Sequence, residues 1–268
     1  MGMLSNAPRR LARFGSKALQ DNPEVAVSEE RGVRSLHLGS ATIQSSMRVS
    51  APYDLELTYT RGMMCFLLFS KTARSVLMVG LGGGSIPKFI HHYLPEFRTT
   101  VVELNQAVIS AAHGQFFLPD DDERLQVLEG DGVEFIAEHP DSHDVLMLDA
   151  YDAKGLAPDL SSQAFYDSCH RALTDDGILV VNLWGSDKKF DVYLQRIEQS
   201  FDSAVLKLPT GRPGNIVVFA FKRHAGDLRM KSLLERAWRL QSELKIEFSE
   251  FLNKLHEYNL HSETRIIV

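Results

Sequence analysis

The feature that most constrains the fold is a glycine-rich turn that directly follows a buried strand. Residues 75–80 read Ser-Val-Leu-Met-Val-Gly, a continuous apolar run of the kind found in a parallel strand buried on both faces. Gly80, Gly82, Gly83 and Gly84 follow within five residues, and a helix-like segment comes next. Glycines at this place let the backbone turn tightly and approach a ligand at the crevice where open α/β sheets bind cofactors. The order strand, glycine turn, helix therefore predicts a nucleotide-binding site rather than a turn that is merely tight.

The alternation of strand-like and helix-like segments continues along the chain. Further strands are expected at 99–104, 125–130, 144–150 and 177–184, and helices at 85–94, 106–116, 133–139, 161–173 and 190–201. The segments 204–208 and 215–221 flank a turn-rich stretch and predict an antiparallel pair. The pattern predicts an α/β fold with a Rossmann-like, doubly wound seven-stranded sheet, the layout of class I methyltransferase-like domains.

Smaller regions flank this sheet. Short strands within 25–49 and an amphipathic helix over 53–69 predict a β-rich leader that is too small to hold a core alone. Beyond the sheet, one face stays apolar over many turns, which predicts a C-terminal helix or helix pair. We expect a solvated tail at 1–22 and the leader with its helix at 23–72. The Rossmann-like nucleoside-binding domain is expected at 73–225 and the helical segment at 226–268.

Composition narrows the class of partner. The 268 residues are 44% hydrophobic and 24% charged, which is ordinary for a globular protein. Because 35 acidic residues outnumber 29 basic ones, we expect no general attraction to nucleic acid or to anionic membranes, and no apolar run is long enough for a spanning helix. Cys65 and Cys169, far apart in sequence, form no disulfide framework and fit a reducing cytoplasm.

Acidic residues at strand ends indicate the ligand. Glu103 ends the second strand, 103 − 80 = 23 residues after Gly80, where an acid accepts hydrogen bonds from ribose hydroxyls. Its alternative reading is an ordinary exposed acid. The glycines and Glu103 together fit both NAD enzymes and enzymes that use an adenosyl-sulfonium compound.

A Gly-Asp-Gly motif after the third strand separates these two classes. The side chain of Asp131 and the adjacent amide of Gly132 are suited to reading an adenine edge, for which a dinucleotide fold has no particular need. Asp is also a favoured helix N-cap, and the two roles are compatible. The motif favours the adenosyl-sulfonium class.

Two carboxylates follow the fourth strand. Asp149 and Asp152 stand three residues apart at the mouth of the crevice, where they are suited to holding a cationic amine and taking its proton. A solvated loop with capping acids is the alternative. That alternative explains Asp149 poorly, because Asp149 terminates an apolar strand.

With these motifs the chain resembles the spermidine synthases, or polyamine aminopropyltransferases, from about Leu36 to Phe221. The resemblance implies that Glu103 binds ribose and that Asp131 with Gly132 binds adenine. It implies that Asp149 is the catalytic carboxylate that orients and deprotonates the attacking amine, with Asp152 helping to hold the polyamine. Two leader residues are implied as well, at the positions of the family's nucleoside-contacting glutamine and of the tyrosine in its Tyr-His-Glu segment: Gln44 and Tyr59.

The chain departs from that family at three places. Gly83 replaces the Asp of the glycine loop that engages the amino end of the decarboxylated cofactor, and Arg61 replaces the Glu of Tyr-His-Glu. Ala153 replaces the proline of Asp-Ser-Ser-Asp-Pro. A missing acid and an added cation suit a donor that keeps its carboxylate, which is S-adenosylmethionine itself. Arg61 facing solvent is the alternative.

The resemblance therefore implies a transferase that moves an aminopropyl group from decarboxylated S-adenosylmethionine to a putrescine-like amine. The alternatives are an S-adenosylmethionine-dependent methyltransferase, a homologue that binds the nucleoside without turnover, and, more distantly, an NAD-dependent dehydrogenase. We expect a cytoplasmic homodimer or higher homo-oligomer, with no metal, nucleic acid or membrane partner.

Overall fold

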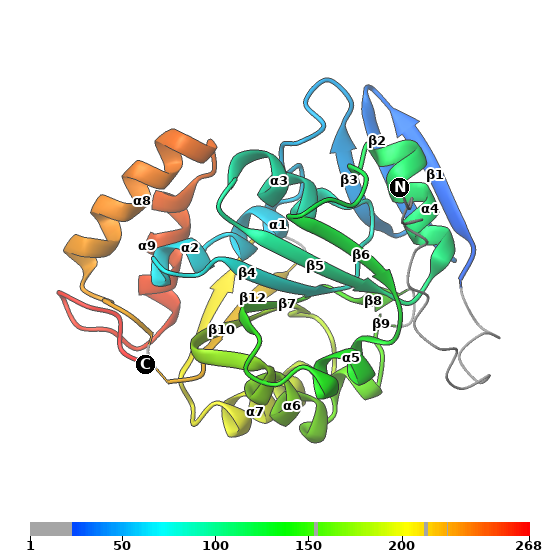
Figure 1. Ribbon diagram of the computed structural model, residues 1–268. Coiled ribbons are helices and arrows are strands. Elements are labelled where there is room, and N and C mark those ends of the chain that lie inside the picture. Colours follow the sequence, from blue (N-terminus) through cyan, green and yellow to red (C-terminus); the bar gives the residue numbers. More distant parts are fainter. Residues whose placement is uncertain (1–22, 153–154, 212–213, 224) are drawn as a thin grey trace, which may run out of the picture.

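The computed structural model describes residues 23–268 except 153–154, 212–213 and 224. The side chain of Asp152 is also not described. The expected tail at 1–22 lies outside the described residues. A seven-stranded sheet forms the centre of the molecule in the order β11-β12-β10-β7-β4-β5-β6 (Figure 1). Its strands are β4 (Ser75–Val79), β5 (Arg98–Glu103), β6 (Leu125–Glu129), β7 (His143–Leu148), β10 (Leu173–Trp184), β11 (Val205–Pro209) and β12 (Asn215–Phe221). The first five are parallel, whereas β12 runs antiparallel to both of its neighbours, so the predicted doubly wound sheet with an antiparallel edge is confirmed.

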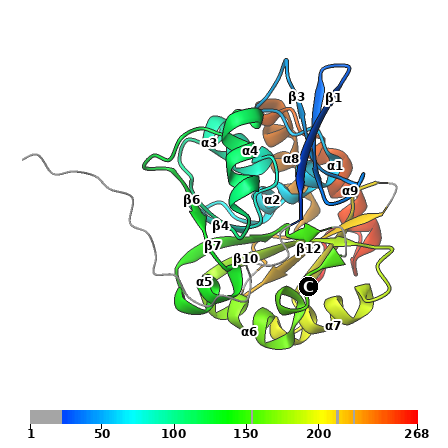
Figure 2. The ribbon, with the colours of Figure 1, turned by 90° about the vertical axis from the view of Figure 1, so that its right-hand side faces the viewer.

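Helices cover both faces of the sheet (Figures 1 and 2). One face carries α3 (Ser85–Tyr93), α4 (Gln106–Phe116), α8 (Met230–Leu244) and α9 (Phe248–Tyr258). The other carries α5 (Gly132–Glu138), α6 (Gln163–Ala172), which follows a 3₁₀ turn at Asp159–Ser161, and α7 (Phe190–Ser200). Successive strand residues point to opposite faces of the sheet. Met78 therefore packs on the side of α3, α4, α8 and α9, and Val79 packs on the side of α5, α6 and α7.

The leader folds as an antiparallel sheet of β1 (Val25–Glu30), β2 (Val33–Leu38) and β3 (Ile43–Arg48). The single helix predicted over 53–69 is wrong. Two short helices stand there, α1 (Thr58–Met63) and α2 (Phe66–Phe69), separated by a turn. The helix starts late because Leu57 is extended, with φ −83° and ψ 136°, and the carbonyls of Leu55 and Glu56 bond a side chain instead of helical amides.

The C-terminal segment is a pair of helices, within the sequence expectation of one helix or two. The connection turns at Lys245, whose φ is +59°, and α9 packs on β11. Just after α9, the Asn259 side chain accepts from the amide of Lys207 and donates to its carbonyl, both at 2.8 Å, so the exposed edge of the sheet is bonded at this point. No described helix has the length and apolarity that crossing a bilayer demands.

The carboxyl ends of the parallel strands lie along one edge of the sheet. The amide of Gly80 donates to Val102, that of Gly130 to Glu103, and that of Asp149 to Val79, at 3.0, 3.0 and 3.1 Å. The glycine turn, the Gly-Asp-Gly motif and the end of β7 are therefore neighbours. A small unpredicted hairpin of β8 (Tyr151–Asp152) and β9 (Gly155–Leu156) follows.

Candidate active site

The glycine turn is built from conformations that favour glycine. Gly80, Gly82 and Gly84 have φ of +90°, +54° and +68°. A Cβ on Gly80 would lie 2.4 Å from the carbonyl oxygen of Asp149, so no other residue fits without moving backbone. The turn is thus pressed against the end of β7, so the glycine turn and Asp149 meet at the carboxyl-end edge of the sheet, which is called the crevice below.

Glu103 is tied to the glycine turn. Its carboxylate accepts from the amide of Leu81 at 2.8 Å and from the amide of Asn105 at 2.8 Å. Burial raises the pKa of Glu103, and these backbone bonds pull that pKa back down. Each carboxylate oxygen still has a free lone pair for a ligand hydroxyl. Glu103 is therefore a partly buried, anchored acid, which removes the reading as an ordinary exposed one.

Asp131 caps a helix, as its alternative reading allowed. Its side chain accepts from the amide of Val133 at 2.8 Å, and the residue is exposed at the crevice edge. Gly132 is buried, and a Cβ there would lie 2.5 Å from Cγ1 of Val79. The start of α5 therefore packs closely on β4. The adenine role of Asp131 and Gly132 stays a prediction.

Asp149 is the centre of a polar network at the end of β7. Its carboxylate accepts from the Tyr59 hydroxyl at 3.1 Å and from the Asn182 amide at 2.9 Å. The Asn182 carbonyl oxygen in turn accepts from the side chain of Asn215 at 2.9 Å. Burial raises the pKa of Asp149, while the two donors lower it. A carboxylate whose pKa is raised in this way is a stronger base than an exposed one.

The leader supplies Tyr59 and Gln44 to the same crevice. The Tyr59 hydroxyl also lies 3.4 Å from the backbone carbonyl oxygen of Gln44, and burial beside Asp149 raises the pKa of Tyr59 well above its ordinary value. The side-chain nitrogen Nε2 of Gln44 is buried without a hydrogen-bond partner. A buried, unpaired donor is costly, so it fits a ligand acceptor such as a nucleoside oxygen or nitrogen.

The hairpin after Asp149 adds an aromatic wall. The ring of Tyr151 stacks on that of Trp184 with centroids 4.7 Å apart, and the Tyr151 hydroxyl accepts from the Trp184 amide at 3.1 Å. Asp152 belongs to β8, and its side chain lies outside the described residues. Its expected role in holding the amine therefore stays a prediction.

The crevice thus has two parts. Each part is named after the ligand expected from the sequence. The nucleoside half is the glycine turn with Glu103 and Asp131, and the amine half is Asp149 with Tyr59 and Asn182. Within the described residues, no group of three or more His, Cys, Asp and Glu side chains is arranged to hold a metal ion.

Sequence reasoning missed Asn182. It sits near the carboxyl end of β10, in the apolar run that begins at Ile178, and is 3% exposed. A lone Asn in such a run indicates a polar partner, because an unpaired buried amide is costly. That signal was present in the sequence, although the identity of the partner was not.

Comparison with known proteins identifies the family. The family model described as "Spermine/spermidine synthase domain" matches residues 56–227. A polyamine aminopropyltransferase from Chromobacterium violaceum is 36% identical to this chain over 94% of it and 96% of that protein. The chain belongs to the spermine/spermidine synthase family.

Solved structures agree with this family's fold. A probable spermidine synthase from Corynebacterium glutamicum has a TM-score of 0.69 at 16% identity and covers 91% of this chain and 95% of its own. Human methyltransferase-like protein 13, solved in complex with SAH, has a TM-score of 0.63 at 25% identity and covers 70% of this chain and 92% of its own.

Close packing explains why glycine stands at position 83, where the family pattern described above has aspartate. A Cβ on Gly83 would lie 2.8 Å from Cδ1 of Phe116 and 2.9 Å from Oγ of Ser45. The Ser45 hydroxyl lies 3.3 Å from that of Ser85, at the start of α3. An aspartate at 83 therefore has no room unless its neighbours move, and neutral hydroxyls stand beside the turn instead.

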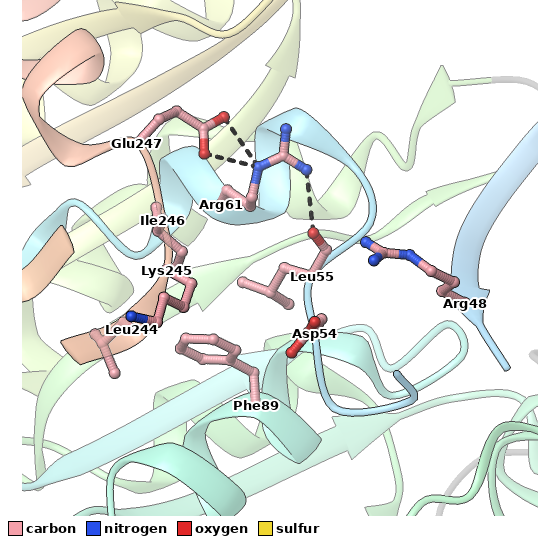
Figure 3. A pocket seen from close by; sticks show the side chains of 9 residues that line it. All are labelled: Arg48, Asp54, Leu55, Arg61, Phe89, Leu244, Lys245, Ile246 and Glu247. Carbon is pink, nitrogen blue, oxygen red and sulfur yellow. Dashed lines mark hydrogen bonds and ion pairs between the residues drawn. The ribbon is translucent and has the colours of Figure 1, made fainter. Parts of the chain in front are cut away.

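The second departure from that pattern, Arg61, is corrected by the structure. Its guanidinium does not project freely into solvent or toward a ligand carboxylate, because it bonds the carboxylate of Glu247 (Figure 3) and the carbonyls of Leu55 and Glu56. Nε donates to both oxygens of Glu247, at 2.9 and 3.0 Å. Arg61 therefore gives no preference for S-adenosylmethionine over its decarboxylated form.

Proposed function

We propose that this protein transfers an aminopropyl group from decarboxylated S-adenosylmethionine to a putrescine-like amine. It is a transferase of polyamine biosynthesis, and the polyamine aminopropyltransferase described above matches nearly the whole chain. The observation that carries the residue roles is the carboxylate of Asp149, held by two donors at the crevice beside the glycine turn. Binding of SAH by a similar fold supports an S-adenosylmethionine-derived donor.

The reaction needs a base. An alkylamine has a pKa of about 10.4, so it is mostly protonated near neutral pH and must lose a proton before it can attack. Its nitrogen then bonds to the aminopropyl carbon, the carbon–sulfur bond breaks, and sulfur keeps the electron pair as methylthioadenosine leaves. Asp149 accepts the amine's proton, and its raised pKa helps because a stronger base shares that proton better. Asp152 and Tyr59 help to orient the acceptor in this proposal.

The nucleoside half holds the donor in line with the acceptor. Glu103 accepts from the ribose hydroxyls, and Asp131 with the Gly132 amide pairs with adenine. The unpaired Nε2 of Gln44 donates to the nucleoside from the leader side. The chain's catalytic contribution is mainly this positioning, because the sulfonium already carries an activated leaving group.

Methyl transfer is the second candidate, supported by the absence of a carboxylate at Gly83. Two assays separate the candidates. The protein is incubated with putrescine and either donor, and the products are identified by mass spectrometry. Spermidine and methylthioadenosine from the decarboxylated donor are the expected result, whereas methylated putrescine from S-adenosylmethionine overturns it. Binding of methylthioadenosine without turnover of either donor identifies a homologue that has lost activity. Gly83→Asp is a poor test, because the variant must displace Phe116 or Ser45.

A homodimer or larger homo-oligomer in the cytoplasm completes the proposal. Exposed apolar side chains near the C-terminus, among them Tyr258 and Leu260, support self-association. Light scattering of the purified full chain gives the oligomeric state directly.

A further inference from the structure

The helix that carries Tyr59 is not stable in its own right. Helix α1 has six residues, no side-chain cap at its N-terminus and no acid in its first turn. Isolated helices of this length do not form, so the position of α1 depends on contacts with other parts of the chain. The direction of the Tyr59 hydroxyl therefore depends on those contacts too.

Arg61 makes the contacts that hold the start of this helix. One terminal nitrogen of its guanidinium donates to the carbonyls of Leu55 and Glu56, at 3.0 and 2.7 Å. The other donates to the hydroxyl of Thr58 at 3.3 Å. Arg61 thus bonds the residues immediately before Tyr59 and ties the start of α1 to its own side chain.

The direction of that guanidinium is set from the C-terminal segment. Glu247, at the start of α9, accepts from Nε of Arg61 with both carboxylate oxygens (Figure 3). The Arg61 and Glu247 side chains are only 23% and 29% exposed, so this charge-assisted contact is partly shielded from water. Residues two apart on a helix point to nearly opposite sides. Helix α1 therefore lies between Asp149, which Tyr59 contacts, and the C-terminal pair, which Arg61 contacts.

We infer that Glu247 is a positioning residue for the reaction: through Arg61 and α1 it fixes the Tyr59 hydroxyl on Asp149. This inference rests on the proposed role of Asp149 as the base. The groups facing Asp149 are Tyr59 from α1, Asn182 from β10 and Tyr151 from β8. Because the Tyr59 hydrogen bond lowers the pKa of Asp149, a displaced α1 raises that pKa.

The test compares Glu247→Ala with Tyr59→Phe and with the double variant in the full chain. In Glu247→Ala, kcat/KM for the acceptor falls about three- to tenfold, and the acidic limb of its pH profile moves to higher pH, as in Tyr59→Phe. The affinity for methylthioadenosine stays within about twofold of the natural protein. In the Tyr59→Phe background, Glu247→Ala has little further effect, because the contact that it positions is already gone.

Controls separate positioning from general stability. Asp141→Asn removes the carboxylate that pairs at 2.7 Å with the mostly buried Lys222, remote from α1, and leaves the pH profile unchanged. A cavity of about 340 Å³ borders Arg61 and Glu247, so water can reach the guanidinium when Glu247 is truncated. If Glu247→Ala still fails to fold, Glu247→Gln keeps one acceptor and shows a smaller shift of the same sign.

Two results overturn the inference: an unchanged acidic limb in folded Glu247→Ala or Glu247→Gln, or fully additive effects of Glu247→Ala and Tyr59→Phe. If Asp149→Asn and Tyr59→Phe are themselves silent, the proposed role of Asp149 is at fault instead. The two failures are thus distinguishable.

Discussion

The two halves of the crevice reach their geometry by different means. In the nucleoside half, Glu103 and Asp131 bond backbone amides close to them in the same sheet edge, and the glycine turn is fixed by backbone packing. In the amine half, Asp149 is held by side chains from the leader and from β10. The two acids of the nucleoside half are therefore held by the sheet edge itself, whereas the network around Asp149 is assembled from distant segments.

The two halves are sensitive to different kinds of substitution. Backbone bonds survive most side-chain substitutions, so we expect the nucleoside half to tolerate most changes outside its acids and its closely packed glycines. Side-chain networks are non-additive, and removing one member affects the rest. Substitutions around Asp149 should therefore change turnover and its pH dependence, while nucleoside affinity stays nearly constant.

The largest expected effect is that of Asp149→Asn. Removing the base should lower kcat by roughly 10²–10⁴-fold, with methylthioadenosine affinity nearly intact. Steady-state kinetics and calorimetry on the same preparation measure both. Near-normal turnover would mean that Asp149 has only a structural role at the end of its strand. It would contradict the separate role given to the amine half.

Glu103→Ala tests the nucleoside half. A lost charged hydrogen-bond partner in a partly buried site costs about 1.5–3 kcal/mol, so methylthioadenosine should bind about ten- to a hundredfold more weakly. Asp131→Ala should also weaken binding, and the lost helix cap should lower stability by about 1 kcal/mol. Unchanged affinity in both variants contradicts the assignment of this half.

Asn182→Ala tests the support that the central sheet gives to Asp149. Asp149 loses a donor and the Asn215 side chain loses its acceptor, so stability should fall by about 1–3 kcal/mol. The pKa of Asp149 should rise further, because this donor lowers it. Urea unfolding and the pH profile of kcat/KM report the two effects. A weaker affinity for methylthioadenosine at full stability would argue against separate halves.

Tyr59→Phe should give the smallest effect. The ring stays and only the hydroxyl goes, so kcat/KM for the acceptor should fall about three- to tenfold. Asp149 acts in its ionised form. Losing a donor raises its pKa, and activity should therefore disappear at higher pH on the acidic side than in the natural protein. A limb that moves to lower pH contradicts the sign of this interaction.

The sequence predicted what depends on local pattern and on strand order. Apolar runs place the seven strands, and parallel strand ends must meet, which brings Glu103 near the turn and Asp149 near both. Contacts between segments far apart in the chain could not be predicted from the sequence. Arg61 and Glu247 lie 186 residues apart, and nothing in either local pattern pairs them. The packing of Phe116 and Ser45 around Gly83 likewise depends on how the leader sits on the sheet.

The asparagine that follows α9 has a practical consequence for handling the protein. By pairing with both main-chain groups of Lys207, Asn259 imitates one residue of an additional strand on β11. An outer strand with free amides and carbonyls is a template for other chains. A truncation that removes α9 and Asn259 would uncover this template, and the shortened chain should precipitate or form filaments. An affinity tag or fusion partner should therefore follow Asn259 and leave α9 and Asn259 in place.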